Sequence, residues 1–154
     1  MPAIHFLFVD DEEKLTEAIA ERLRLKGAVV DISLSGAEAM SRLEKCSNID
    51  IVMLDLQMPD EDGITVLKEI KEKYPLVEVI VLTGHPSIQS AINAIKCGAF
   101  DYLIKPYDLN DLLVKADNAV LRKRDRESKI FNKRSKPYIS DGERKKLISK
   151  ILEE

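Results

Sequence analysis

Five short apolar runs alternate with helical patterns along the first 121 residues, and this alternation constrains the fold most strongly. The runs cover residues 4–9, 28–33, 50–54, 77–82 and 100–104. Continuous apolar runs of this length, each separated from the next by a helical repeat, are typical of buried parallel strands. The expected helices cover residues 12–26, 35–45, 63–74 and 87–97, and a fifth runs from 109 to beyond Leu121. Repeated strand–helix units predict a parallel sheet with helices on both faces.

Five such units suit a doubly wound α/β sheet with the strand order 2-1-3-4-5. This order places the first and third strands side by side, at the point where the winding reverses direction. In open sheets of this kind, ligands bind in a crevice outside the carboxyl ends of the strands. We therefore expect the functional residues at the ends of the central strands.

Polar side chains follow four of the five expected strands at their carboxyl ends. Asp10 and Asp11 follow the first strand and Asp55 follows the third. Thr83 follows the fourth strand and Lys105 follows the fifth. Three carboxylates in one crevice repel one another and need a cation, and Mg²⁺ prefers such oxygen ligands. With a hydroxyl and an ammonium group beside them, they predict a magnesium site that receives a phosphoryl group.

The distribution of charge divides the chain near residue 122. Residues 1–121 carry a net charge of −9, residues 122–136 carry +6, and residues 137–154 carry zero. This change of sign indicates the end of the main domain. We expect one domain over residues 3–121, followed by a charged linker and a short helical tail over residues 122–154.

The tail has its own helix signals. Lys136-Pro137 is expected to end the preceding helix, because the residue before a proline disfavours helical geometry. Ser140 and Glu143 have the spacing of a capping box, which opens a final helix. The apolar stripe of that helix consists of Leu147, Ile148, Ile151 and Leu152. The stripe needs a partner, which is either the main domain or a second chain.

Composition excludes several classes of protein. No apolar stretch approaches the roughly 20 residues of a membrane span, and the start MPAIHFLFVDD has no basic leader. Cys46 and Cys97 follow no metal or redox spacing. We expect a cytoplasmic protein with reduced thiols and no membrane association. The basic segment 122–136 is interpreted as a solvated helix face, so direct DNA binding by this chain is not expected.

The pattern resembles the receiver domain of two-component response regulators over residues 3 to about 122. The resemblance depends on VDDE at 9–12, VMLDLQMPDEDG at 52–63, VLTGH at 81–85 and GAFDYLIKP at 98–106. Each motif is short, but their order and their positions at strand ends make the combination specific. The resemblance implies a flavodoxin-like fold with the same strand order.

The resemblance also implies catalytic roles at the phosphoryl group. Asp55 would be the phosphoacceptor, since a carboxylate can form an acyl phosphate. Lys105 would pair with Asp55 in the unloaded state and with a phosphoryl oxygen in the loaded state. Thr83 would donate its hydroxyl to another phosphoryl oxygen. A cis peptide bond is implied before Pro106.

The resemblance implies a magnesium ligand set and a switch as well. Asp11, Asp55 and the main-chain carbonyl of Gln57 would bind Mg²⁺ directly, and Asp10 would act mostly through water. Tyr102 would be the aromatic switch: when Thr83 moves toward the phosphoryl group, the ring of Tyr102 can turn inward. The alternative for Tyr102 is a half-buried strand tyrosine that does not switch.

Two further positions flank the phosphoryl group in the family. These are Gln57, two residues after the acceptor, and His85, two residues after Thr83. Their implied role is to modulate the phosphoryl lifetime through access of the hydrolytic water. For His85, an ordinary exposed loop residue is the alternative interpretation.

The implied function is that of a response regulator receiver. A sensor histidine kinase or a phosphotransfer protein would load Asp55, and the domain would catalyse only its own phosphorylation and dephosphorylation. It is therefore not expected to be an enzyme with a free substrate. The surface formed by residues 87–97, residues 100–104 and the following helix would change shape and signal to an output partner. A homodimer through that surface or through the tail is compatible with the sequence.

Two outputs and one rival function stay open. The chain is either a complete regulator that acts through protein contacts or the N-terminal receiver of a longer transcriptional regulator. The phrase TGHPSIQSAINAIKCGAFDYLIKP resembles receivers of the second kind. The rival from another class is a magnesium-dependent aspartyl-phosphate phosphotransferase or phosphatase. Such an enzyme generally needs a second acid and a substrate lid, and the sequence indicates neither.

Overall fold

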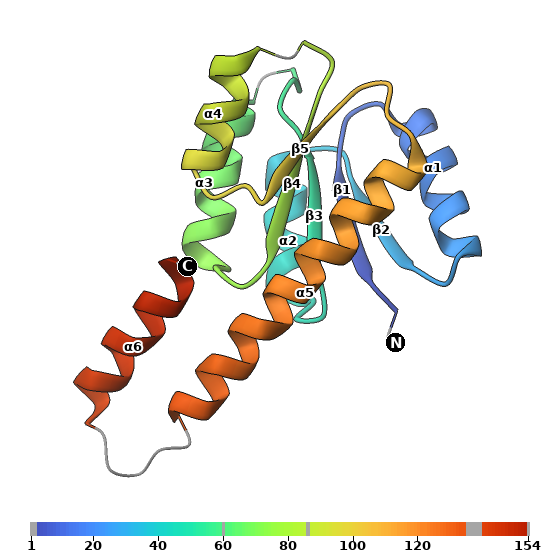
Figure 1. The fold of residues 1–154 in the computed structure, drawn as a ribbon. Helices are drawn as coiled ribbons and strands as arrows, with labels where there is room; N and C mark the ends of the chain where they lie inside the picture. Colours follow the sequence, from blue (N-terminus) through green and yellow to red (C-terminus); the bar gives the residue numbers. More distant parts are fainter. Residues whose placement is uncertain (1–2, 60, 86, 135–139, 154) are drawn as a thin grey trace.

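The predicted sheet and its strand order are confirmed by a computed structural model, which describes residues 3–59, 61–85, 87–134 and 140–153 (Figure 1). All the strands are parallel, and the order is β2-β1-β3-β4-β5. The strands are β1 (His5–Val9), β2 (Val29–Ser33), β3 (Ile51–Asp55), β4 (Glu78–Thr83) and β5 (Asp101–Ile104). The helices are α1 (Glu13–Leu25), α2 (Gly36–Lys45), α3 (Gly63–Lys73), α4 (Ile88–Lys96), α5 (Leu109–Arg134) and α6 (Asp141–Glu153).

The sheet lies between two layers of helices, and each layer encloses its own half of the core. Helices α1 and α5 cover one face, while α2, α3 and α4 cover the other (Figure 1). Successive residues of a strand point to opposite faces, so Phe6 and Phe8 of β1 pack toward α1 and α5. Leu7 and Val9 pack toward the other layer. The central strands are therefore buried on both faces, which explains their continuous apolar sequence.

Local signals in the sequence account for several helix ends. Gly27 and Gly98, which follow α1 and α4, have φ values of 95° and 106°, a conformation that glycine adopts without strain. At the start of α2, the hydroxyl of Ser35 accepts a hydrogen bond from the Glu38 N–H at 3.2 Å. The Glu38 carboxylate reaches the Leu34 N–H instead of the Ser35 N–H. Ser35 and Glu38 have the spacing of a capping box, but only the hydrogen bond to the serine hydroxyl is formed.

The tail folds back on the domain as a helical hairpin. Helix α5 continues through residue 122 to Arg134, and α6 contacts α5 and runs beside it (Figure 1). The Glu143 N–H donates to the Ser140 hydroxyl at 3.2 Å, as expected at the start of α6. Ile151 of α6 and Ile130 of α5 are buried. The apolar stripe of α6 thus finds its partner within the chain, whereas the predicted helix end at Lys136-Pro137 lies outside the described residues.

A buried carboxylate anchors α5 to the lower edge of the sheet. Glu78, the first residue of β4, is 0% exposed and pairs with the Arg122 guanidinium through both of its oxygens. The Lys71 ammonium lies 3.5 Å from Glu78 Oε1, and Arg126 Nη1 lies 3.7 Å from the same oxygen. The Arg122 guanidinium also stacks over the Phe100 ring, 4.7 Å from its centroid. This cluster fixes the lower half of α5 against α3 and β4.

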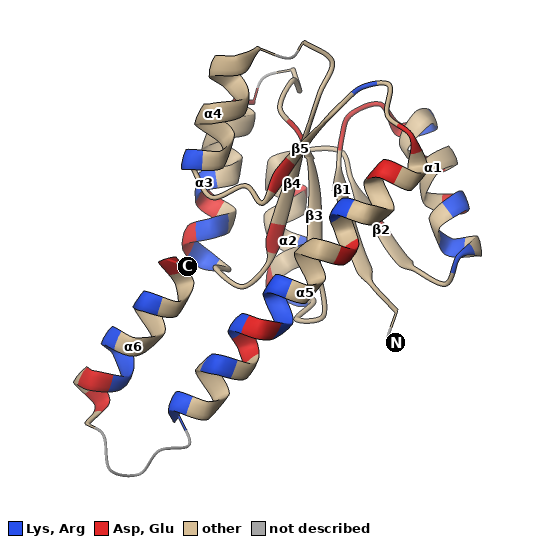
Figure 2. Cartoon of the chain, viewed as in Figure 1, with Lys and Arg blue, Asp and Glu red and all other residues tan. Residues whose placement is uncertain are grey.

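Ion pairs of Lys123 and Arg126 change how the basic segment 122–136 is interpreted. In Figure 2, both blue (Lys and Arg) and red (Asp and Glu) stretches of ribbon occur along the lower half of α5. Lys123 contacts Asp50 at 3.1 Å, and Asp50 also accepts the His5 N–H at 2.9 Å. Lys123 and Arg126 are therefore held against the domain. The expectation of a solvated face was wrong for these two residues, because Asp50 attracts Lys123 and the buried Glu78 attracts Arg126.

Burial also shifts the titration of Lys71. Desolvation lowers the pKa of its ammonium to about 8, against a smaller opposing effect from Glu78. The ammonium donates to the carbonyls of Pro75 and Val77, both at 2.8 Å. These contacts tie the end of α3 to the turn that precedes β4.

Replacing Glu78 with glutamine should destabilise the chain strongly. Glu78→Gln leaves two arginines and a lysine near a neutral amide, and loss of one partner from a buried ion cluster costs about 3 kcal/mol. The matched control is Glu69→Gln, which removes an exposed pair with Lys73 and should cost less than about 0.5 kcal/mol. Urea unfolding followed by circular dichroism measures both values. Equal, small losses would show that the cluster does not stabilise the fold.

Candidate functional site

The three predicted acids meet at the carboxyl edge of the sheet. Strands β1 and β3 are neighbours, with Val9 paired to Leu54, so the residues after Val9 and Leu54 lie side by side. Asp10, Asp11 and Asp55 each offer a carboxylate oxygen within 4.8 Å of the others. Asp10 and Asp55 are each 3% exposed, whereas Asp11 is exposed. The topology thus brings together acids that are about 45 residues apart in sequence, as expected from the strand order.

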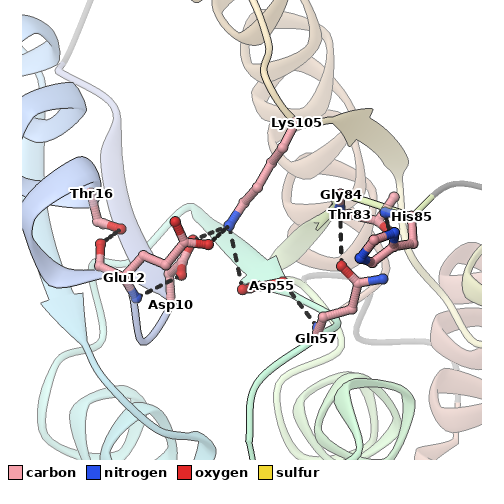
Figure 3. A network of polar contacts seen from close by, with 9 residues as sticks. All are labelled: Asp10, Glu12, Thr16, Asp55, Gln57, Thr83, Gly84, His85 and Lys105. Carbon is pink, nitrogen blue, oxygen red and sulfur yellow. Dashed lines mark hydrogen bonds and ion pairs between the residues drawn. The ribbon is translucent and has the colours of Figure 1, made fainter.

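Lys105 reaches this cluster from the end of β5. Its ammonium donates to Asp10 Oδ2 at 2.8 Å and to Asp55 Oδ2 at 3.3 Å (Figure 3). A third contact, to Glu12 Oε1 at 3.3 Å, was not predicted, although Glu12 belongs to the VDDE motif. The peptide bond between Lys105 and Pro106 is cis, as the resemblance implied. One cation therefore contacts three carboxylates.

Four carboxylates, those of Asp10, Asp11, Glu12 and Asp55, surround the single ammonium of Lys105. Burial raises the pKa of Asp55, and the charge of Asp10 adds to this effect. The Gln57 N–H and Lys105 act in the opposite direction. Burial alone would lower the pKa of Lys105, but Asp10, Asp55 and Glu12 together raise it above its usual value. Lys105 therefore stays protonated, and the acids still lack a full counter-charge.

The loops after β3 and β4 close the other side of the site. The Gln57 N–H donates to Asp55 Oδ1 at 2.9 Å, and Gln57 Oε1 accepts the Gly84 N–H at 3.1 Å (Figure 3). Thr83 is buried at the end of β4, and its Oγ1 accepts the His85 N–H at 3.1 Å. Gly84 was not among the predicted residues, because its contribution is a main-chain N–H that no side-chain pattern reveals.

Tyr102 lies at the far side of Thr83 from the acids. Its side chain is 37% exposed on β5, and the Lys115 ammonium lies 5.8 Å from its ring centroid. A small hollow separates it from the site. This hollow is lined by Leu56, Val81, Thr83, Ser87, Ser90, Ala91 and Tyr102. Thr83 and Tyr102, the two residues that the resemblance implied as a switch, therefore line the same hollow.

The donor set fits a hard divalent cation. Three carboxylates supply the oxygen ligands that Mg²⁺ prefers, and Mg²⁺ usually retains several waters beside one or two carboxylates. Beside the acids, a cavity of about 370 Å³ opens between α1 and the loops after β4 and β5. Its lining includes Asp10, Glu12, Gly84 and Lys105. The site is therefore an acidic cluster whose ligands fit a divalent cation, and Lys105 lines the cavity beside it.

Fold and site together define a doubly wound parallel α/β domain with a cluster of three acids at its central strand ends. The family model of the response regulator receiver domain matches residues 6–117. An NtrX-like response regulator of Rickettsia conorii is 37% identical over 142 residues. The chain therefore belongs to the response regulator receiver domain family.

Two further comparisons extend this result. The DNA-binding transcriptional regulator NtrC of Escherichia coli K12 is 32% identical over 112 residues, or 73% of this chain. The solution structure of the beryllofluoride-activated NtrC4 receiver domain dimer has a TM-score of 0.73 and 34% identity. That match covers 77% of this chain and 98% of the NtrC4 receiver.

The chain is much shorter than the curated regulators that it matches. The Rickettsia match covers 86% of this chain but 30% of the regulator, and the NtrC match covers 24% of NtrC. Among the described residues, no helix is both long enough and apolar enough to cross a membrane.

Magnesium should stabilise the chain through the acidic cluster. At a concentration tenfold above its dissociation constant, a ligand of the folded state adds about 1.4 kcal/mol, or about 3–6 °C in Tm for a chain of this size. Asp11→Asn should remove most of this shift, since it deletes one of the clustered carboxylates. Asp125→Asn, which alters an acid of α5 paired with Lys129, should retain it. Thermal melts with and without MgCl₂ measure the shifts, and equal shifts in all three proteins would refute the site.

Proposed function

We propose that this receiver accepts a phosphoryl group on Asp55 from the phosphohistidine of a sensor histidine kinase or phosphotransfer protein. The observation that supports the proposal is the convergence of Asp55 with Asp10, Asp11 and Lys105 at one strand edge. Phosphoryl transfer depends mainly on positioning and on neutralising the charge of the phosphoryl oxygens. A carboxylate nucleophile with a nearby cation site and an ammonium group meets both requirements.

The transfer itself requires little rearrangement of Asp55. A carboxylate oxygen of Asp55 forms the new bond to phosphorus, and the histidine nitrogen leaves with the pair of electrons from the broken P–N bond. Bound Mg²⁺, held by Asp11, Asp55 and the Gln57 main-chain carbonyl, with Asp10 acting through water, would neutralise charge on the reacting oxygens. The Gln57 N–H already orients Asp55 at 2.9 Å.

Lys105 and Thr83 then stabilise the phosphoryl group. The Lys105 ammonium lies 3.3 Å from Asp55 and can move from that carboxylate to a phosphoryl oxygen. A lysine suits this exchange, because its point charge binds without fixed bidentate geometry. Thr83 Oγ1 accepts the His85 N–H, so the hydroxyl hydrogen stays free to donate to a phosphoryl oxygen.

Movement of Thr83 toward the phosphoryl group would enlarge the hollow that separates it from Tyr102. The Tyr102 ring, outward in this structure, would turn into that space and change the surface of α4, β5 and α5. Gln57 and His85 flank the site and would set the lifetime of the acyl phosphate by limiting water access. The receiver would thus catalyse only its own loading and unloading.

Replacing Asp55 with asparagine should abolish phosphorylation. Treatment with acetyl phosphate and Mg²⁺ should add one phosphoryl mass to the wild-type chain and none to Asp55→Asn, because an amide oxygen is a poor nucleophile. Asp125→Asn on α5 should retain the increment. Intact-mass spectrometry reads the result. An undiminished increment in Asp55→Asn would refute the acceptor assignment, and sustained turnover of a general phosphate ester would favour the phosphatase alternative.

For the output, we propose that the α4 and β5 surface binds a second copy when Asp55 is loaded. This surface exposes several large apolar side chains in this monomer. They are Ile88, Ile92, Ile95, Tyr102 and Ile104. The NtrC4 receiver is described as a beryllofluoride-activated dimer, which supports a dimer of the loaded receiver here. The match to 24% of NtrC also supports the alternative proposal that this receiver is the N-terminal part of a longer transcriptional regulator.

Loading should therefore raise the molar mass in solution. With Mg²⁺ and beryllofluoride, light scattering should report a dimer for the wild-type chain and a monomer for Ile95→Asp, which places a charge on the apolar surface. Leu25→Asp is the matched control, since Leu25 is also exposed but lies at the end of α1. A wild-type mass that does not change on loading would contradict the dimer.

A further inference from the structure

The side chain of Gln57 joins the two loops that border the site. Gln57 lies two residues after Asp55, in the loop after β3, and Gly84 lies directly after Thr83, in the loop after β4. The side-chain carbonyl oxygen of Gln57 accepts the Gly84 N–H at 3.1 Å, across 27 residues of sequence (Figure 3). The neighbouring His85 N–H is already bound within its own loop, by Thr83. Gln57, two residues after the proposed phosphoacceptor Asp55, therefore holds one specific main-chain donor, the Gly84 N–H.

The Gly84 N–H is connected to the phosphoacceptor through one residue, because the Gln57 N–H donates to Asp55 Oδ1 at 2.9 Å while the Gln57 side chain holds Gly84. Gly84 lines the same cavity as Asp10 and Lys105, and it follows the threonine assigned to a phosphoryl oxygen. Fixed main-chain N–H groups stabilise oxyanions well, because they need no reorganisation when charge arrives. An N–H group makes one strong hydrogen bond at a time, so Gln57 and a phosphoryl oxygen would compete for the Gly84 N–H.

We propose that Gln57 is a latch on the unloaded receiver: its side-chain oxygen occupies the Gly84 N–H, and a phosphoryl oxygen must displace it during loading. This inference rests on the proposed role of Asp55 as phosphoacceptor. The latch opposes loading because the hydrogen bond from Gln57 is lost when the phosphoryl group arrives. It acts on the equilibrium of loading, which distinguishes it from control of the hydrolytic water, an effect on rate alone.

The first test compares the affinity of the chain for beryllofluoride at saturating Mg²⁺. Gln57→Met keeps the length of the side chain and the main-chain carbonyl but removes the acceptor oxygen. Because one partly solvated hydrogen bond no longer competes, we expect beryllofluoride to bind about two- to fivefold more tightly than to the wild type. Glu69→Met is the control, since Glu69 pairs with Lys73 within α3, away from the α4 and β5 surface, and its affinity should not change. Fluorine NMR titration measures the dissociation constants.

The second test examines the latch without any phosphoryl analogue. The Gly84 amide proton should exchange with solvent several-fold faster in Gln57→Met than in the wild type, and at the wild-type rate in Glu69→Met. Equal exchange of the Gly84 amide in wild type and Gln57→Met would refute the contact. Faster exchange with unchanged or weaker beryllofluoride affinity would refute the competition.

The beryllofluoride titration distinguishes a failure of the latch from a failure of the phosphoacceptor assignment. If the wild-type chain binds no beryllofluoride with Mg²⁺, the phosphoacceptor assignment fails, and the competition fails with it. If the wild type binds beryllofluoride and Gln57→Met binds it no more tightly, the phosphoacceptor role stands and only the latch is wrong.

Discussion

The contact of the Lys105 ammonium with the buried carboxylates of Asp10 and Asp55 is the interaction on which the site depends. The winding of the sheet forces the ends of β1 and β3 together, so their acids cannot move apart. At 2.8 Å and 3.3 Å, one ammonium offsets part of their repulsion. The remaining negative charge fits a divalent cation such as Mg²⁺, which under the proposed function would also offset the charge of an incoming phosphoryl group.

The opposite edge of the sheet is held together by a second group of buried charges. There Glu78 and Arg122 form a buried ion cluster that anchors the lower half of α5. Helix α5 begins four residues after Lys105 and ends beside α6, so one rigid element connects the site with the tail. Under the proposed switch, the surface of α4, β5 and upper α5 would change while this cluster keeps the lower half of α5 attached to the sheet.

Sequence patterns predicted the sheet and the clustered acids because both follow from short-range rules. Continuous apolar runs mark doubly covered strands, and parallel strands deliver the residues after Val9, Leu54 and Leu82 to one edge. Individual roles at that edge stay predictions, since geometry alone does not show a reaction. The contact of Gly84 was beyond prediction because a main-chain N–H has no signature in the sequence. The contacts of Glu12 and Arg126 depend on side-chain packing between elements, which periodicity does not encode.

The central claim is that acids from two loops share one divalent ion within reach of the Lys105 ammonium. A crystal structure grown with Mn²⁺ and beryllofluoride tests it directly, because Mn²⁺ favours the same oxygen ligands as Mg²⁺ and is located by its anomalous scattering. The account predicts one ion in contact with the carboxylates of Asp11 and Asp55, with beryllofluoride on Asp55 and Lys105 on a fluorine. An ion bound away from these carboxylates, or beryllofluoride on another residue, would contradict it.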